Sequence, residues 1–169
     1  MKLKELYESN SRAYDAELYI KQFNEDDNHE ANLLLGDLSM TKIPIQIDGS
    51  EFTNYEFSDN NLSTFENFPP VAKRIGCNRN KFESLHNIHK YIKEMSVFST
   101  LSFFENPIKS HVLGLLKIKN LKEVILYGTG DDKKLMDVET IINKYLPEGD
   151  LLKCQEELID AGLDDFAQL

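Results

Sequence analysis

The chain has 169 residues, of which 41% are hydrophobic and 10% aromatic, enough apolar material for the core of one domain. Its 19 basic and 29 acidic residues give a formal charge of −10, which argues against a general nucleic-acid binder and against adhesion to an anionic membrane. No apolar run approaches the roughly 18 residues of a transmembrane helix, and the start MKLKELYESN lacks the apolar stretch of a signal peptide. Two cysteines, Cys77 and Cys154, make no disulfide framework, so we expect free thiols in a reducing cytoplasm.

The charge is unevenly distributed along the chain. Residues 1–56 hold 5 basic and 12 acidic residues, a net charge of −7. Residues 57–127 hold 10 basic and 6 acidic residues (+4), and residues 128–169 hold 4 and 11 (−7). Acidic ends therefore enclose a mildly basic middle, which prompts a search for internal repeats.

The first segment, residues 1–34, predicts an N-terminal helical cap. Residues 3–23 have the pattern of an amphipathic helix, and the polar run that follows predicts a solvated loop. Glu25, Asp26 and Asp27 in this run resemble calcium ligands, but the glycine and the final glutamate of a calcium loop are missing. The helix residues expected to face inward are Leu3, Leu6, Tyr7, Tyr14, Leu18 and Ile20.

Residues 35–131 contain a repeat. The segment YEFSDNNL aligns with IGCNRNKF at an offset of 20 residues, and LSFFENPI and VILYGTGD follow at offsets of 26 and 23. The segment GDLSMTKI precedes the first by 19 residues. All fit the pattern L-x-L-x-x-N-x-L, with Asn60, Asn80 and Asn106 in three copies and Thr41 and Thr129 in the terminal ones. This pattern resembles the leucine-rich repeat.

The repeat has a direct physical meaning. Its first two apolar positions are alternate residues of a short strand and point inward. The asparagine lies where the chain leaves the strand, so its amide can satisfy buried backbone groups of the turn. Cys77 takes a core position, where cysteine behaves as a small hydrophobe. Apolar residues continue at the second, fifth and eighth positions after two asparagines, as Leu62, Phe65, Phe68, Phe82, Leu85 and Ile88.

Residues 132–169 predict a C-terminal helical cap, and the acidic residues of both caps are expected on their outer faces. One helix ends at Pro147 and Gly149, and a second helix carries Cys154. The expected inward residues are Leu135, Val138, Ile141, Ile142 and Tyr145, then Leu151, Leu152, Leu158, Ile159, Leu163 and Phe166. The fold class predicted is α/β, a short leucine-rich-repeat solenoid of four or five coils with parallel strands and helical caps.

Three phrases carry a further resemblance. FFENPIKSHVLGLLKIKNLKEV, INKYL and CQEELIDAGLDDFAQL look like the C-terminal part of short leucine-rich-repeat proteins of large tailed bacteriophages. Those relatives often have C-S-N-N where this chain has Phe103, Phe104, Glu105 and Asn106. The resemblance covers about residues 35–169; it implies the fold and a phage origin and leaves the activity open.

Sites for enzyme chemistry are weak in this sequence. His86 and His89 form H-x-x-H, but no third ligand lies at metal spacing, so we predict no metal site and no cofactor. Gly128-Thr129-Gly130 follows a predicted strand as phosphate loops do, yet it lacks a G-K-S/T ending, and the repeat explains it as a turn. An enzyme using either feature remains an alternative, and the main prediction is that the chain is not an enzyme.

The strand residues between the inward ones should form a ladder on the outer, concave face. Phe104, Ile125 and Tyr127 lie together on it and are predicted to anchor a protein partner, unless a cap or the insert before the third repeat covers them. Glu56, Ser58, Asn78 and Arg79 are predicted to line the same site. The expected rows are Asp37, Glu56, Gly76, Ser102 and Ile125; then Ser39, Ser58, Asn78, Phe104 and Tyr127; then Met40, Asp59, Arg79, Glu105 and Gly128.

These features favour a non-enzymatic protein-binding module. With the phage resemblance, we expect an accessory protein that binds a bacterial host protein in the host cytoplasm, with inhibition of that protein as one mode. Nucleic acid and membrane are not expected partners, although the acidic caps could mimic nucleic-acid phosphate toward a basic protein. The alternative is a structural component of the phage virion.

Overall fold

The computed structural model describes residues 15–26, 32–127 and 132–169. Several sequence-based expectations lie outside these ranges, namely those for Leu3, Leu6, Tyr7, Tyr14, Asp27, Thr129 and the glycine loop at residues 128–130.

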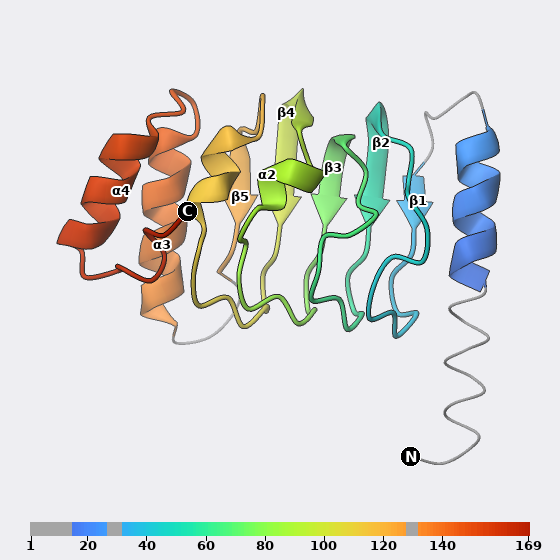
Figure 1. Cartoon of the computed structure of the whole chain (residues 1–169), viewed down its shortest axis with the longest axis horizontal. Coiled ribbons are helices and arrows are strands. Elements are labelled where there is room, and N and C mark those ends of the chain that lie inside the picture. The colour runs from blue at the N-terminus through green and yellow to red at the C-terminus, as the bar shows by residue number, and fades with distance from the viewer. Residues whose placement is uncertain (1–14, 27–31, 128–131) are drawn as a thin grey trace, which may run out of the picture.

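The centre of the molecule is a sheet of five parallel strands in the order β1-β2-β3-β4-β5 (Figure 1). Each strand returns to the start of the next through a long connection, which makes a β-solenoid of about four turns with helices at its ends. The predicted α/β solenoid with parallel strands is confirmed at this level. The strands are β1 (Asn32–Leu34), β2 (Ser50–Glu56), β3 (Val71–Gly76), β4 (Glu94–Ser102) and β5 (Glu123–Ile125).

Strand register confirms three of the four predicted repeat offsets. Ile75 pairs with Tyr55 and with Leu101, and Leu101 pairs with Val124, which gives offsets of 20, 26 and 23 residues. The first offset is wrong: Leu33 pairs with Tyr55, an offset of 22 residues where 19 was expected. Strand β1 therefore lies within the predicted cap 1–34, ahead of the predicted boundary at residue 35.

This shift changes the outward residues of the first coil. Leu34, Gly36 and Asp37 occupy the positions predicted for Asp37, Ser39 and Met40. Leu38 then stands at the asparagine position, which is why the consensus pattern did not locate this coil.

The three asparagines do what the repeat predicted. Asn60, Asn80 and Asn106 are buried, and each amide nitrogen donates to the carbonyl three residues earlier at 2.9–3.1 Å. The same amides reach the preceding coil. The nitrogens donate to carbonyls of Leu35, Phe57 and Cys77, and the oxygens accept from the backbone N–H groups of Met40, Leu62 and Phe82.

The core lies between the sheet and the returning segments, which include α2 (Ile88–Tyr91) and η1 (Leu113–Lys117). Stacked aromatic rings fill much of it. The rings of Phe65 and Phe82 are parallel at 4.7 Å, and Phe82 meets Phe103 edge-on at 5.4 Å. The six predicted apolar positions after Asn60 and Asn80 are all buried, as is Cys77.

A helix over residues 15–25 covers the β1 end of the solenoid (Figure 1). Ala16 and Ile20 are fully buried, and Phe23 meets the ring of Tyr55 edge-on at 5.9 Å. The inward prediction is confirmed for Ile20 and wrong for Leu18, which is exposed because the buried face repeats at Ala16, Ile20 and Phe23.

The β5 end is covered by α3 (Lys133–Tyr145) and α4 (Leu151–Asp160), whose first turns are capped by Asp132 and Asp150. The predicted inward residues Leu135, Val138, Ile141, Ile142, Leu158, Leu163 and Phe166 are buried, whereas Leu152 and Ile159 are exposed on the outer face of α4. Within the described ranges, no helix is long and apolar enough to cross a membrane.

Candidate protein-binding face

Alternation along the strands directs one set of side chains into the core and the other onto the opposite side of the sheet. We call this second side the open face. It consists of four rows: Asn32, Asn54, Arg74, Thr100 and Glu123; Leu34, Glu56, Gly76, Ser102 and Ile125; Gly36, Ser58, Asn78, Phe104 and Tyr127; and Asp37, Asp59, Arg79 and Glu105. The seven predicted site residues all lie on it.

Hydrogen bonds connect several of these residues across neighbouring strands. The Ser58 backbone N–H donates to the Glu56 carboxylate at 2.9 Å, and the Asn78 backbone N–H donates to the Ser58 hydroxyl at 3.1 Å. The Asn78 side-chain oxygen then accepts from the Ser102 hydroxyl at 2.6 Å and from the Phe104 backbone N–H at 3.2 Å. The network fixes where the chain leaves β4, and with it the position of Phe104.

The glycine at position 76 leaves room for the Glu56 carboxylate. A Cβ at Gly76 would lie 2.4 Å from Oε2 of Glu56, so any larger residue would displace the carboxylate. The Glu56 side chain therefore lies over β3. Its carboxylate accepts from the Ser58 N–H and occupies the space that a side chain at position 76 would fill.

Arg79 and Phe104 form a stacked pair on the open face. The Arg79 guanidinium lies 5.3 Å from the centre of the Phe104 ring and makes two bonds of 2.6 Å to the Asp59 carboxylate. These bonds lower the pKa of Asp59 and raise that of Arg79. Asp59, Arg79 and Glu105 share a left-handed backbone, with φ of 60°, 52° and 58°, so the turn has the same form in these three coils.

The predicted residues differ in how accessible they are. Ser58 and Asn78 are 6% and 8% exposed, so their role is to position the neighbouring backbone. Arg79 is exposed, and Glu56, Phe104, Ile125 and Tyr127 are half-buried. Burial of the three apolar anchors by a cap or by the insert was the alternative, and each of them retains accessible surface.

The last strand is fixed by the C-terminal cap. Both the Leu126 and the Tyr127 backbone N–H groups donate to the Glu139 carboxylate of α3, at 2.7 and 2.8 Å. The side chain of Asn143 accepts from the Val124 N–H and donates to the Val124 carbonyl, both at 2.8 Å. The side chains of α3 thus pair with the outer edge of β5, which would otherwise be open.

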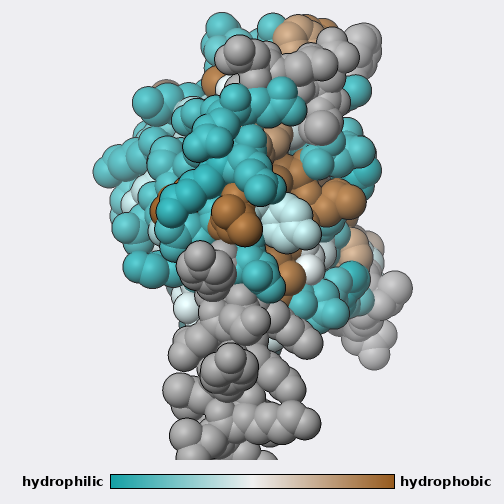
Figure 2. Space-filling view, turned by 90° about the vertical axis from the view of Figure 1, so that its right-hand side faces the viewer, coloured by the Kyte–Doolittle hydropathy of each residue, from teal (hydrophilic) through white to brown (hydrophobic). Residues whose placement is uncertain are grey.

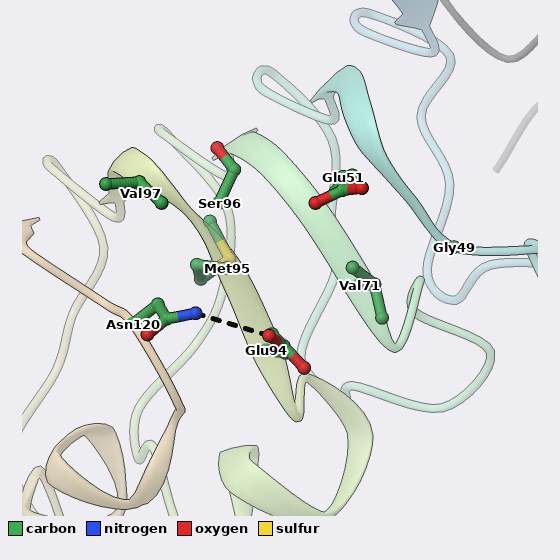
Figure 3. Close-up of a pocket in the computed structure, with 8 residues that line it drawn as sticks. All are labelled: Gly49, Glu51, Val71, Glu94, Met95, Ser96, Val97 and Asn120. Carbon is green, nitrogen blue, oxygen red and sulfur yellow. Dashed lines mark hydrogen bonds between the residues drawn. The ribbon is translucent and has the colours of Figure 1, made fainter.

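A hollow of about 390 Å³ lies near the start of β3, on the same side of the sheet (Figure 3). It exists because both neighbouring strands bulge beside β3. Two extra residues stand in β2 between Ser50 and Asn54, and three extra residues stand in β4 between Met95 and Thr100. Its lining residues are Gly49, Glu51, Val71, Glu94, Met95, Ser96, Val97 and Asn120.

The hollow was missed from the sequence. The 26-residue interval indicates extra residues before the third copy, but not that part of them forms a bulge inside β4. The seven-residue length of β2 has no counterpart in the repeat pattern at all.

The histidines considered for metal binding are spread around the returning segments. His86 meets the ring of His111 edge-on at 5.0 Å, and His89 has its Nδ1 atom buried without a hydrogen-bond partner among the described residues. No group of three or more His, Cys, Asp or Glu side chains within the described ranges could hold a metal ion. Burial raises the pKa of the Cys77 thiol well above its usual value and that of Cys154 to about 12.

The β1 end of the solenoid exposes a second group of apolar side chains. Leu18, Tyr19, Leu34 and Phe52 are all exposed, and Figure 2, which looks onto this end, shows hydrophobic residues between hydrophilic ones. None of these was predicted as a site residue.

Comparison with known proteins adds no relative: no protein-family profile, curated protein or solved structure matches this chain.

Proposed function

We propose that the chain is a non-enzymatic protein-binding module of the leucine-rich-repeat type, and that its open face binds a bacterial host protein. In this proposal it is a phage accessory protein that acts in the host cytoplasm and can inhibit its target. The repeat pattern and the C-terminal phrases that resemble phage proteins support this reading.

The observation that carries the proposal is the group of half-buried apolar side chains at the β4 and β5 end of the open face. Phe104 lies just after the end of β4, Ile125 ends the neighbouring strand β5 and Tyr127 follows it, and Arg79 stacks on Phe104. Aromatic residues and arginine dominate binding energy at protein interfaces. The backbone N–H groups of both aromatic residues are already hydrogen-bonded to side chains, Phe104 to Asn78 and Tyr127 to Glu139. Binding a partner therefore costs little further conformational entropy at these positions.

A pull-down with a tagged chain expressed in host bacteria tests the proposal. Wild type should recover one bacterial protein in stoichiometric amount, and the double variant Phe104→Ser with Tyr127→Ser should lose it. The matched control is Tyr19→Ser with Leu152→Ser, which removes one aromatic and one aliphatic side chain exposed by 61% and 69% at the two ends of the solenoid.

The control variant should recover the partner as wild type does, and circular dichroism should show all three proteins folded. Equal recovery by wild type and the Phe104/Tyr127 variant would contradict binding by the open face. Detection of the chain in purified virions by mass spectrometry, without a host partner, would favour the structural alternative.

A further inference from the structure

The hollow beside β3 combines carboxylates with apolar walls. Glu51 contributes from the β2 bulge, Glu94 from the first residue of β4, and Val71 and Val97 supply apolar surface between and beside them (Figure 3). A lysine or arginine side chain is complementary to this lining, because it has an apolar stem with a cationic end.

The two carboxylates differ in how many hydrogen bonds and ion pairs they already make. Oε1 of Glu94 accepts from Lys119 at 2.8 Å and from the Asn120 amide at 3.2 Å, which leaves Oε2 for another donor. Glu51 makes no ion pair with any residue that the structure describes, and Lys73, the exposed cation of neighbouring β3, does not line the hollow. A cation entering here would therefore meet one unpaired carboxylate and one that is half used.

The surface around the hollow is also negatively charged. On the open face, the acidic residues Asp37, Glu56, Asp59, Glu105 and Glu123 outnumber the basic residues Arg74 and Arg79. The net charge of this face therefore favours a partner with net positive charge.

We infer that the hollow is a subsite for a lysine or arginine side chain of the protein partner, so that the partner segment is basic with an apolar anchor. This inference rests on the proposed function, because the same partner would place its anchor against Phe104 and Tyr127. From Val71 at the hollow to Asn78, which shares a row with Phe104 and Tyr127, the chain advances seven residues, roughly 23 Å at about 3.3 Å per residue. An extended segment of about seven residues would join the two contacts.

Selection of random peptides displayed on yeast tests this without knowledge of the natural partner. Peptides are selected on wild type and sorted against the Phe104→Ser, Tyr127→Ser variant. Those that depend on the two aromatic residues should carry a lysine or arginine about seven positions from an apolar anchor. For a synthetic peptide from this set, Glu51→Gln should weaken binding about tenfold, as expected for a charge-assisted contact in a partly enclosed site.

Two controls separate charge at the hollow from general effects. Glu66→Gln removes an exposed carboxylate from a returning segment and should leave the affinity unchanged, and replacing the peptide's lysine or arginine with norleucine should make wild type and Glu51→Gln bind alike. Aromatic-dependent peptides that lack basic residues, or that bind Glu51→Gln as tightly as wild type, would overturn the subsite and leave the proposed function standing. Failure to find any aromatic-dependent peptide would contradict both.

Discussion

A buried asparagine at the end of each inner strand links two consecutive coils. Asn80 donates to Phe57 of the coil before it and to Cys77 of its own coil, and it accepts from the Leu62 N–H. Removing the amide would leave these buried backbone groups without hydrogen-bond partners. Each unpaired group in a dry core lowers the free energy of unfolding substantially.

We predict that Asn80→Ala lowers the free energy of unfolding by roughly 2–4 kcal/mol, because several buried groups lose their partner together. Urea denaturation followed by circular dichroism measures this. Asn61→Ala is the matched control, since that side chain is exposed. Equal stability of the two variants would show that the ladder does not hold the coils together.

His89 is expected to make the stability of the fold depend on pH. Burial, and after it the charges of Lys117, Lys90 and His86, lowers its pKa below the usual value of 6.5. The folded protein therefore favours the neutral ring, and the unfolded chain takes up a proton first as the pH falls. The stability contributed by the neutral ring is complete above pH 6.5 and is lost as the pH falls through the lower, folded pKa.

We therefore expect wild type to lose more stability between about pH 7.5 and pH 5 than His89→Leu does. Unfolding free energies measured across this range for both proteins give the difference directly, because the other titrating groups are common to both. A difference that does not change with pH would contradict the role given to His89.

At the level of elements, the middle of the solenoid was predictable because each inner coil has two neighbours. Asn60, Asn80 and Asn106 are needed to hold the coil before them, so the asparagine pattern marks these coils in the sequence. In the described part of the chain the first coil is preceded by the helix over residues 15–25, and Leu38 stands at its asparagine position. This is why its offset was wrong while the next three were confirmed.

Much of the candidate site followed from the same register. Glu56, Ser58, Asn78, Phe104, Ile125 and Tyr127 lie on one face because alternation within paired strands fixes their direction. The left-handed turn at Arg79 and the space above Gly76 could not be predicted from the sequence, since neither follows from the pattern of apolar residues. The bulges that form the hollow were beyond prediction for the same reason.

Cap α3 closes the sheet with side chains instead of a further strand. Asn143→Ala should lower the free energy of unfolding by roughly 1–3 kcal/mol, although alanine favours helices, because the Val124 N–H and carbonyl lose their partners. Urea denaturation measures the loss. An open β5 edge should also promote self-association, which sedimentation at increasing concentration would detect.

The exposed Thr140→Ala, on the same helix, is the control for the effect of alanine alone. Its hydroxyl bonds within the helix to the Met136 carbonyl and does not touch β5. If Asn143→Ala were as stable and as monomeric as Thr140→Ala, α3 would cover the sheet by apolar packing without protecting its edge.

At the scale of the whole molecule, the net charge of −10 is distributed unevenly between the terminal segments and the middle of the chain. The terminal segments each carry −7, and residues 57–127 are net positive as a whole. Yet the open-face rows contributed by that middle segment, with Asp59, Glu105 and Glu123 against Arg74 and Arg79, do not share its positive balance. The basic residues of the middle therefore lie mainly on the returning segments, away from the surface proposed to bind a partner.

In the proposed function a protein partner sits on the open face and not on the caps. Amide hydrogen exchange of the chain alone and in the recovered complex tests it most directly, because it maps contact along the backbone without substitutions. We predict slower exchange in the complex at residues 102–106 and 125–127, with a second protected stretch at residues 94–97 beside the hollow. Protection confined to the helix at residues 15–25 or to α3 and α4, with the strand ends unchanged, would contradict it.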